Sequence, residues 1–115
     1  MHLSSLGRAK KIKLDMEGAK NVYKQIPISQ ADGTPTFSFR VLTVEPGGHT
    51  PYHTHPFEHL NYIIEGLGTI VAQDGEYEIK TGDFAMILPG ETHQYKNASS
   101  SKPLVMICAV PKEYE

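Results

Sequence analysis

Short stretches in which apolar and polar residues alternate run through most of the chain, separated by glycine, proline or Asp-Gly pairs. Within residues 36–44, for example, Phe37, Phe39 and Val41 share one side of an extended chain, and Ser38 lies on the other. An Asp-Gly pair between two such stretches is typical of a tight β-hairpin. No window of about eleven residues shows a helical period, so the pattern predicts strands rather than helices.

About nine short strands are expected, which favours an all-β fold of the sandwich or barrel type. The expected strands span residues 22–28, 36–44, 52–55, 59–65, 69–73, 77–80, 84–88, 92–97 and 104–110. Residues 1–21 are polar and weakly patterned, and we expect an N-terminal arm there with at most one edge strand.

Length and composition are those of one globular domain, residues 1–115. A net charge of −2 with mixed signs leaves no electrostatic footprint for nucleic acid. No apolar run approaches the roughly 18 residues of a membrane helix, and residues 1–14 lack the apolar core of a signal peptide. The single cysteine, Cys108, excludes an internal disulfide. We therefore expect a cytoplasmic protein without nucleic-acid or membrane partners.

Histidines are concentrated in two places. His53, His55 and His59 fall within one short stretch, and His93 follows a Leu-Pro-Gly-Glu-Thr segment. Residues two apart on a strand project to the same face, so His53 and His55 point together. Because imidazole is a common ligand of transition metals, we interpret the four as ligands of one metal ion inside the barrel. A six-coordinate metal would keep two positions open for water or substrate.

Two motifs around these histidines resemble those of the cupin superfamily. The first, Gly-x5-His-x-His-x3,4-Glu-x6-Gly, spans residues 47–66 and is matched by Gly47, His53, His55 and Gly66. The second, Gly-x5-Pro-x-Gly-x2-His-x3-Asn, spans residues 82–97 and is matched by Gly82, Gly90, His93 and Asn97. His59 occupies the glutamate slot of the first motif, and Leu88 the proline slot of the second.

The resemblance implies a single-domain cupin-type jelly-roll β-barrel with one metal inside, often built as a homodimer. His53, His55 and His93 are carried over as ligands directly, and His59 by position although its residue type differs. The chain is also similar to a subset of small cupins with four histidines. Four imidazoles leave a divalent charge uncompensated, which favours anionic ligands. The metal would be one divalent ion per chain: Mn, Fe, Ni, Zn or Cu.

Several residues near the motifs have two interpretations. Glu58 is a competing carboxylate, but its strand parity favours a supporting or surface role over ligation. Tyr95 shares the parity of His93 and could line the cavity or pack in the core. Asn61 and Ile63 continue the His59 face, and we expect them as pocket walls or core.

Expected positions can be given for four further residues. Phe39 and Met86 are expected to point inward, as pocket walls. Arg40, on the opposite side from Phe39, is expected at the solvent or at a dimer interface. Cys108 is expected in the core, with cavity lining as the alternative. Of the remaining histidines, His49 is expected on the surface and His2 in the tail.

The motifs favour a metal-dependent enzyme of oxygenase or isomerase type that acts on a small molecule. Tyr95 and Glu58 are its only nameable candidates for a general base. One alternative is a non-catalytic small-molecule or metal-binding module. Another is a structural zinc site, which would be tetrahedral and closed. Exposed edge strands and the N-terminal arm favour a homodimer with strand exchange.

Overall fold

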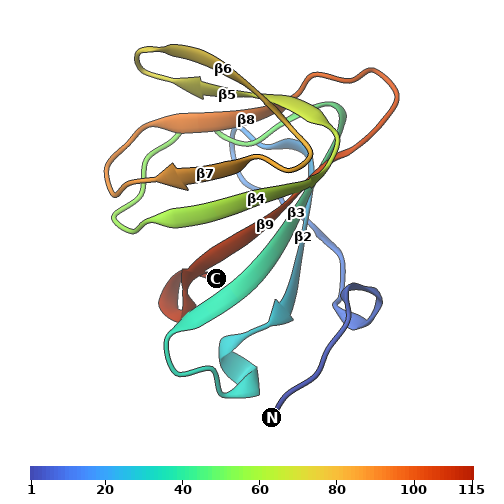
Figure 1. Cartoon of the computed structure of the whole chain (residues 1–115), viewed down its shortest axis with the longest axis vertical. Coiled ribbons are helices and arrows are strands. Elements are labelled where there is room, and N and C mark those ends of the chain that lie inside the picture. Colours follow the sequence, from blue (N-terminus) through green and yellow to red (C-terminus); the bar gives the residue numbers. More distant parts are fainter.

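The structure, a computed structural model, describes all 115 residues and contains one curled antiparallel sheet of nine strands (Figure 1). The strands are β1 (Ile12–Lys13), β2 (Lys20–Ile28), β3 (Phe37–His49), β4 (His59–Glu65), β5 (Leu67–Ala72), β6 (Gly75–Lys80), β7 (Phe84–Ile87), β8 (His93–Asn97) and β9 (Leu104–Pro111). The helices are single 3-10 turns: η1 (Leu6–Arg8), η2 (Gln30–Asp32) and η3 (Lys112–Tyr114). None is long and apolar enough to cross a membrane.

Strand order along the sheet is β6-β5-β8-β3-β9-β4-β7, with β2 beside β3 and β1 beside β2. The sheet curls so strongly that β8 and β4 face one another across the interior (Figure 1). There the Tyr95 hydroxyl on β8 donates to Asn61 Oδ1 on β4 at 2.7 Å. The expectation of an all-β jelly-roll barrel is confirmed.

Two strand boundaries differ from expectation, both near the histidines. The strand expected at residues 52–55 is absent, because Pro51 and Pro56 lack backbone N–H donors and leave a loop. In contrast, β3 continues through Pro46-Gly47-Gly48 as far as His49. Gly47 adopts a φ of 76°, which a glycine accepts without strain. The longer β3 carries the chain directly to the first histidine motif.

Side chains on the concave side of the sheet form the core, and few of them are polar. The core cluster consists of Val22, Leu42, Val44, Ile63, Ile70, Ile79, Tyr95, Leu104, Met106, Cys108 and Val110. Cys108 is fully buried, and burial raises the pKa of its thiol. The expectation of a core cysteine is confirmed, whereas Ile63 packs in the core and does not line the pocket beside the histidines.

The convex side of β3, β9, β4 and β7 is also apolar, and here the sequence-based expectation was wrong. Phe39 and Met86 were expected to point inward, but they are 45% and 61% exposed. Strand register places Phe39, Ala109, Leu60 and Met86 in one row and Val41, Ile107, Tyr62 and Phe84 in the next. We call these two rows the outer apolar face. Since β3 is apolar on both sides, hydrophobicity alone does not determine which side faces the core.

Two motif glycines share a backbone conformation but differ in their surroundings, which allows a controlled test of packing. Gly66 has a φ of 99° and Gly82 a φ of 96°. A Cβ at Gly66 would lie 2.3 Å from the Pro103 carbonyl oxygen, whereas one at Gly82 would meet nothing within 4 Å.

We expect Gly82→Ala to lower the free energy of unfolding by about 1–2 kcal/mol through backbone strain alone. Gly66→Ala should cost about 1–3 kcal/mol more, because the backbone of the 103–104 segment must move. Urea denaturation of both variants measures the difference. Equal losses would show that the Gly66 contact with this segment relaxes freely.

Candidate metal centre

Two backbone hydrogen bonds position the histidine loop against β8. The His53 N–H donates to the His93 carbonyl at 3.1 Å, and the His93 N–H donates to the His53 carbonyl at 3.0 Å. This isolated bridge joins the two motifs, which are far apart in sequence. The ring centroids of His53 and His93 consequently lie 4.9 Å apart, with His55 5.4 Å from His53 and 4.8 Å from His93.

His53, His55 and His93 each present one ring nitrogen to a common space, and the three nitrogens lie within 4.8 Å of one another. In each ring Nδ1 lies 2.7–2.9 Å from a backbone carbonyl oxygen, that of Pro51, Phe57 or Glu91 respectively. A carbonyl oxygen can only accept a hydrogen bond, so Nδ1 carries the hydrogen and Nε2 keeps a lone pair. The same arrangement orients histidine ligands in known metal sites.

The unsatisfied nitrogen of His55 shows that the cluster fits a cation. His55 Nε2 is buried and has no hydrogen-bond partner, which is costly unless something else accepts its lone pair. Burial lowers the pKa of both His55 and His93, so their rings are neutral at neutral pH. Neutral imidazoles with converging lone pairs are the donor set that zinc, copper, iron, nickel or manganese would take.

The fourth predicted ligand, His59, lies beside this cluster but makes a different contact. It begins β4, is buried, and its ring centroid is 4.1 Å from that of His55. Its Nε2 lies 2.9 Å from Nη2 of Arg40. Burial, and next the charge of Arg40, lower the pKa of His59 to about 2, so the neutral ring accepts this hydrogen bond. The structure thus brings three of the four histidines together and places the fourth in contact with an arginine.

Arg40 was expected at the solvent or at an interface, and that expectation was wrong. It pairs with Cys108 across β3 and β9, so it shares the inward parity of the core. The signal that could have placed it is the apolar pair Leu42 and Val44 further along the same side of β3, both buried. Phe37 and Phe39 make the opposite side of this strand apolar as well, and that pattern indicates the wrong inward side.

A pocket of about 240 Å³ opens next to the histidines. His53, His55 and His59 line it together with two cationic side chains, Lys24 and Arg40, and no acidic residue does. Apolar side chains, among them those of Leu14, Met16 and Phe57, complete the wall. The wall of the pocket therefore combines positive charge with apolar surface.

The other candidates near the site lie outside the pocket. Glu58 is exposed and does not line it, in line with a surface role. Tyr95 is 3% exposed and bonded to Asn61, whose amide in turn contacts Cys108 Sγ at 2.9 Å. Burial raises the pKa of Tyr95, which removes it as a general base. His49 is half-buried rather than on the surface, and its Nδ1 lies 3.2 Å from the Thr50 carbonyl oxygen.

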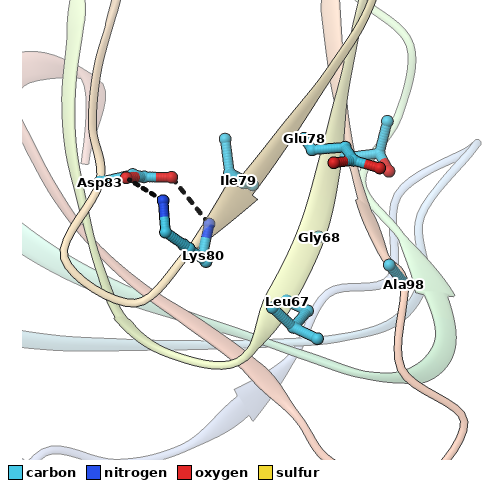
Figure 2. Close-up of a pocket in the computed structure, with 8 residues that line it drawn as sticks. Leu67, Gly68, Glu78, Ile79, Lys80, Asp83 and Ala98 are labelled. Atoms are coloured by element: carbon cyan, nitrogen blue, oxygen red, sulfur yellow. Dashed lines mark hydrogen bonds and ion pairs between the residues drawn. The ribbon is translucent and has the colours of Figure 1, made fainter.

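A larger hollow of about 340 Å³ lies elsewhere, on β5 and β6 (Figure 2). Lys80 and Asp83 form an ion pair of 3.4 Å at its edge, and Leu67 and Gly68 form part of its floor. It contains no histidine and no cluster of groups that could hold a metal. The smaller pocket, beside the histidines, is therefore the better candidate for a reaction site.

Comparison with known proteins supports the motif assignment. A family model described as "Cupin domain" matches residues 40–110. The chain is 28% identical over 92 residues to an uncharacterized protein, MJ1618, of Methanocaldococcus jannaschii. It is 32% identical over 76 residues to an (R)-mandelonitrile lyase of Granulicella tundricola. These regions are 79% and 65% of this chain, and the chain spans only 66% and 58% of the two relatives' own lengths.

Among solved structures, that of the polyketide cyclase RemF from Streptomyces resistomycificus superposes with a TM-score of 0.91. The two sequences are 26% identical, and the match covers 97% of this chain and 80% of that one. The similarity extends over nearly the whole chain, including the strands outside the two motifs.

Proposed function

We propose that this chain, which belongs to the cupin domain family, is a metal-dependent enzyme acting on a small molecule in the pocket beside its histidines. His53, His55 and His93 would hold one divalent transition metal ion: Mn, Fe, Ni, Zn or Cu. The observation that carries this proposal is the convergence of three imidazole nitrogens within 4.8 Å, one of them buried without any partner.

His59 would be the fourth ligand, and Arg40 controls whether it can be. The Nε2 lone pair of His59 can be given either to the arginine or to a metal, but not to both. The ring centroid of His59 already lies 4.1 Å from that of His55, so His59 is close to the cluster of the other three imidazoles. Turning the Arg40 guanidinium away would release the nitrogen.

A metal held by these histidines would supply Lewis acidity. Isomerase-type chemistry is the first candidate reaction and oxygenase-type chemistry the second. The similarity to a lyase and to a cyclase supports an enzyme rather than a purely structural zinc protein. The chain's own contribution is to orient the ligands through backbone carbonyls and to enclose a pocket with cationic and apolar walls.

A non-catalytic binding module is the second candidate, and one observation favours it. Neither Tyr95 nor Glu58 lines the pocket, so the two general bases named from the sequence are absent there. Such a module would bind the same small molecule and release it unchanged.

Metal content tests the ligand assignment. We expect His53→Ala and His93→Ala each to lose the metal found in the untagged wild-type protein, because each removes one of the three imidazoles that already converge. His2→Ala and His49→Ala are matched controls outside the cluster and should keep it. Elemental analysis of the purified proteins gives the answer. A full metal complement in either of the first two variants would disprove the assignment.

Turnover distinguishes the candidate functions. Protein reconstituted with each metal is mixed with a panel of small acids, with and without dioxygen, in single-turnover experiments. We expect conversion of at least one compound with at least one metal. Binding without conversion under every condition would favour the module. Four-coordinate metal without water in X-ray absorption spectra would favour structural zinc.

We also propose that the protein is a homodimer, now through the outer apolar face. Leu60, Phe84 and Met86 of this face are 46%, 80% and 61% exposed, and no residue of its two rows is charged. A two-fold axis brings the same patch of both copies together, which an uncharged apolar patch tolerates without mismatch. Homodimer interfaces are the more apolar class, which fits this composition.

Introducing a charge into this face tests the dimer. Phe84→Asp and Met86→Lys should each give a monomer in analytical ultracentrifugation, because either would place an unpaired charge within the proposed interface. Leu67→Lys, at a site 57% exposed on β5, is the control and should remain dimeric. A wild-type monomer, or a dimer that survives both substitutions, would exclude this interface.

A further inference from the structure

Arg40 is an inward-facing guanidinium with no anion to balance it. Its Nε is buried and has no hydrogen-bond partner, its Nη2 donates to the neutral ring of His59, and its other side-chain partner is the thiol of Cys108. The two ion pairs of the chain lie elsewhere, at His2–Asp32 and Lys80–Asp83. An uncompensated cation away from water is costly, and the cost disappears when an anion joins it.

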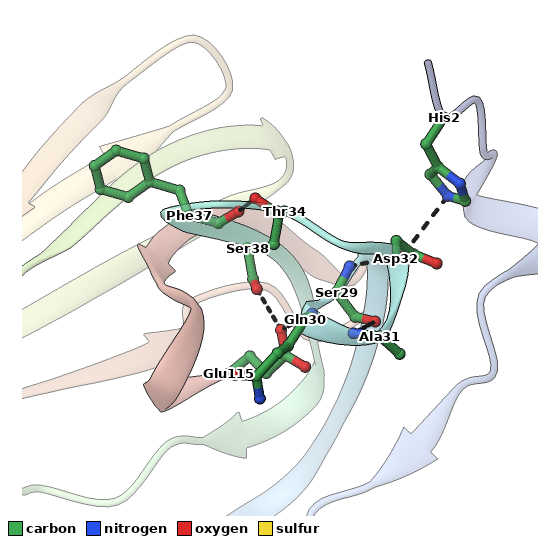
Figure 3. A network of polar contacts seen from close by, with 9 residues as sticks. All are labelled: His2, Ser29, Gln30, Ala31, Asp32, Thr34, Phe37, Ser38 and Glu115. Atoms are coloured by element: carbon green, nitrogen blue, oxygen red, sulfur yellow. Dashed lines mark hydrogen bonds and ion pairs between the residues drawn. The ribbon is translucent and has the colours of Figure 1, made fainter.

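Lys24 adds a second positive charge to the same pocket. Its Nζ donates to the main-chain oxygen of Glu115 at 3.0 Å. Burial first, and then the charge of Arg40, lower the pKa of Lys24. The Glu115 carboxylate attracts Lys24 from a distance, but it is itself bonded to the Ser38 hydroxyl and to the Gln30 N–H (Figure 3). No acidic side chain of the chain reaches Arg40.

The remaining walls of the pocket determine which kind of molecule could carry the anionic group. Its volume of about 240 Å³ is roughly the share of eight water molecules in the liquid. Leu14, Met16 and Phe57 line it, and Phe57 stacks on His55 with ring centroids 4.2 Å apart. The space therefore fits a small molecule with an apolar body and one anionic end.

We propose that Arg40, supported by Lys24, is the binding site for the carboxylate of a small, mainly apolar carboxylic acid. The planar guanidinium offers its Nε–H and an Nη–H as a parallel pair of donors, the geometry that a carboxylate accepts. The apolar part rests against Leu14, Met16 and Phe57. This inference rests on the proposed function, because it places the acid in the pocket beside the metal ligands.

The same site accounts for the contact between Arg40 and His59. The imidazole nitrogen is a weak hydrogen-bond acceptor for the guanidinium, whereas a carboxylate would be a strong one. A bound acid would take over the guanidinium and leave His59 Nε2 free for a metal. Ligand binding and completion of the four-histidine site would then strengthen each other.

Benzoate is the probe, and benzamide, equal in shape but neutral, is its matched control. Isothermal titration calorimetry on metal-free and zinc-loaded protein should detect benzoate and not benzamide. Arg40→Met should weaken benzoate binding by about tenfold or more, as the loss of charged hydrogen bonds predicts. Lys24→Met should weaken it less. Arg8→Met, which removes the other, exposed arginine, should leave binding unchanged.

A second measurement reads the proposed contact directly. The chain has two arginines, so comparison with Arg8→Met assigns the Arg40 Nε–H resonance in ¹H–¹⁵N spectra. It should move downfield on addition of benzoate and stay in place with benzamide. Because Arg40 has no anionic partner, Arg40→Met should keep the wild-type urea midpoint or raise it, so misfolding does not confound the result.

Equal binding of benzoate and benzamide, unchanged affinity in Arg40→Met, or a stationary Nε–H signal in the presence of saturating benzoate would each overturn the proposal. So would a wild-type protein that binds no benzoate. These results are separable from those on the proposed function. Metal content and turnover can persist without carboxylate binding at Arg40, and benzoate can bind at Arg40 when no reaction occurs.

Discussion

The two backbone hydrogen bonds between His53 and His93 are the constraint on which the site depends. They attach a proline-rich loop, which has no other strand pairing, to the first residue of β8. Two further main-chain hydrogen bonds, from Thr50 N–H to the Tyr95 carbonyl and from Gly90 N–H to the His55 carbonyl, both 2.9 Å, hold the loop on either side of this bridge. With the bridge, ligands from two distant parts of the chain share one space, and the carbonyls of the same loop orient the rings of His53 and His55.

An unusual distribution of charge follows from this architecture. The interior holds several neutral imidazoles and one guanidinium, with no carboxylate nearby to balance a cation. In the family motif, one slot carries a glutamate, whose charge would offset part of a metal's. Replacing that glutamate by His59 removes the offset, and Arg40 increases the imbalance. The pocket is therefore suited to an anion, whether or not the protein is an enzyme.

The convex side of the sheet shows why a hydrophobic pattern can mislead. Alternation along β3 identifies two faces, but Phe39 and Val41 make one apolar and Leu42 and Val44 make the other apolar. Burial of the second face against the core leaves the first on the outside, beside Leu60 and Met86 of the neighbouring strands. The same choice of face decided the position of Arg40, so one ambiguity produced two wrong expectations. An outer face this apolar is itself evidence of a partner surface.

The sequence by itself determined the class of fold, most strand positions and three of the four histidines expected to lie together. β4, for example, has the expected bounds, since period-two patterns and turn residues are local signals. Spacing within a motif is local as well, which is why His53, His55 and His93 could be named. Tertiary structure alone decided which face of β3 is inside, that β3 continues past Gly47, and that His59 meets Arg40. Those outcomes depend on contacts between β3, β4, β8 and β9, and no local window of the chain contains the residues on both sides of such a contact.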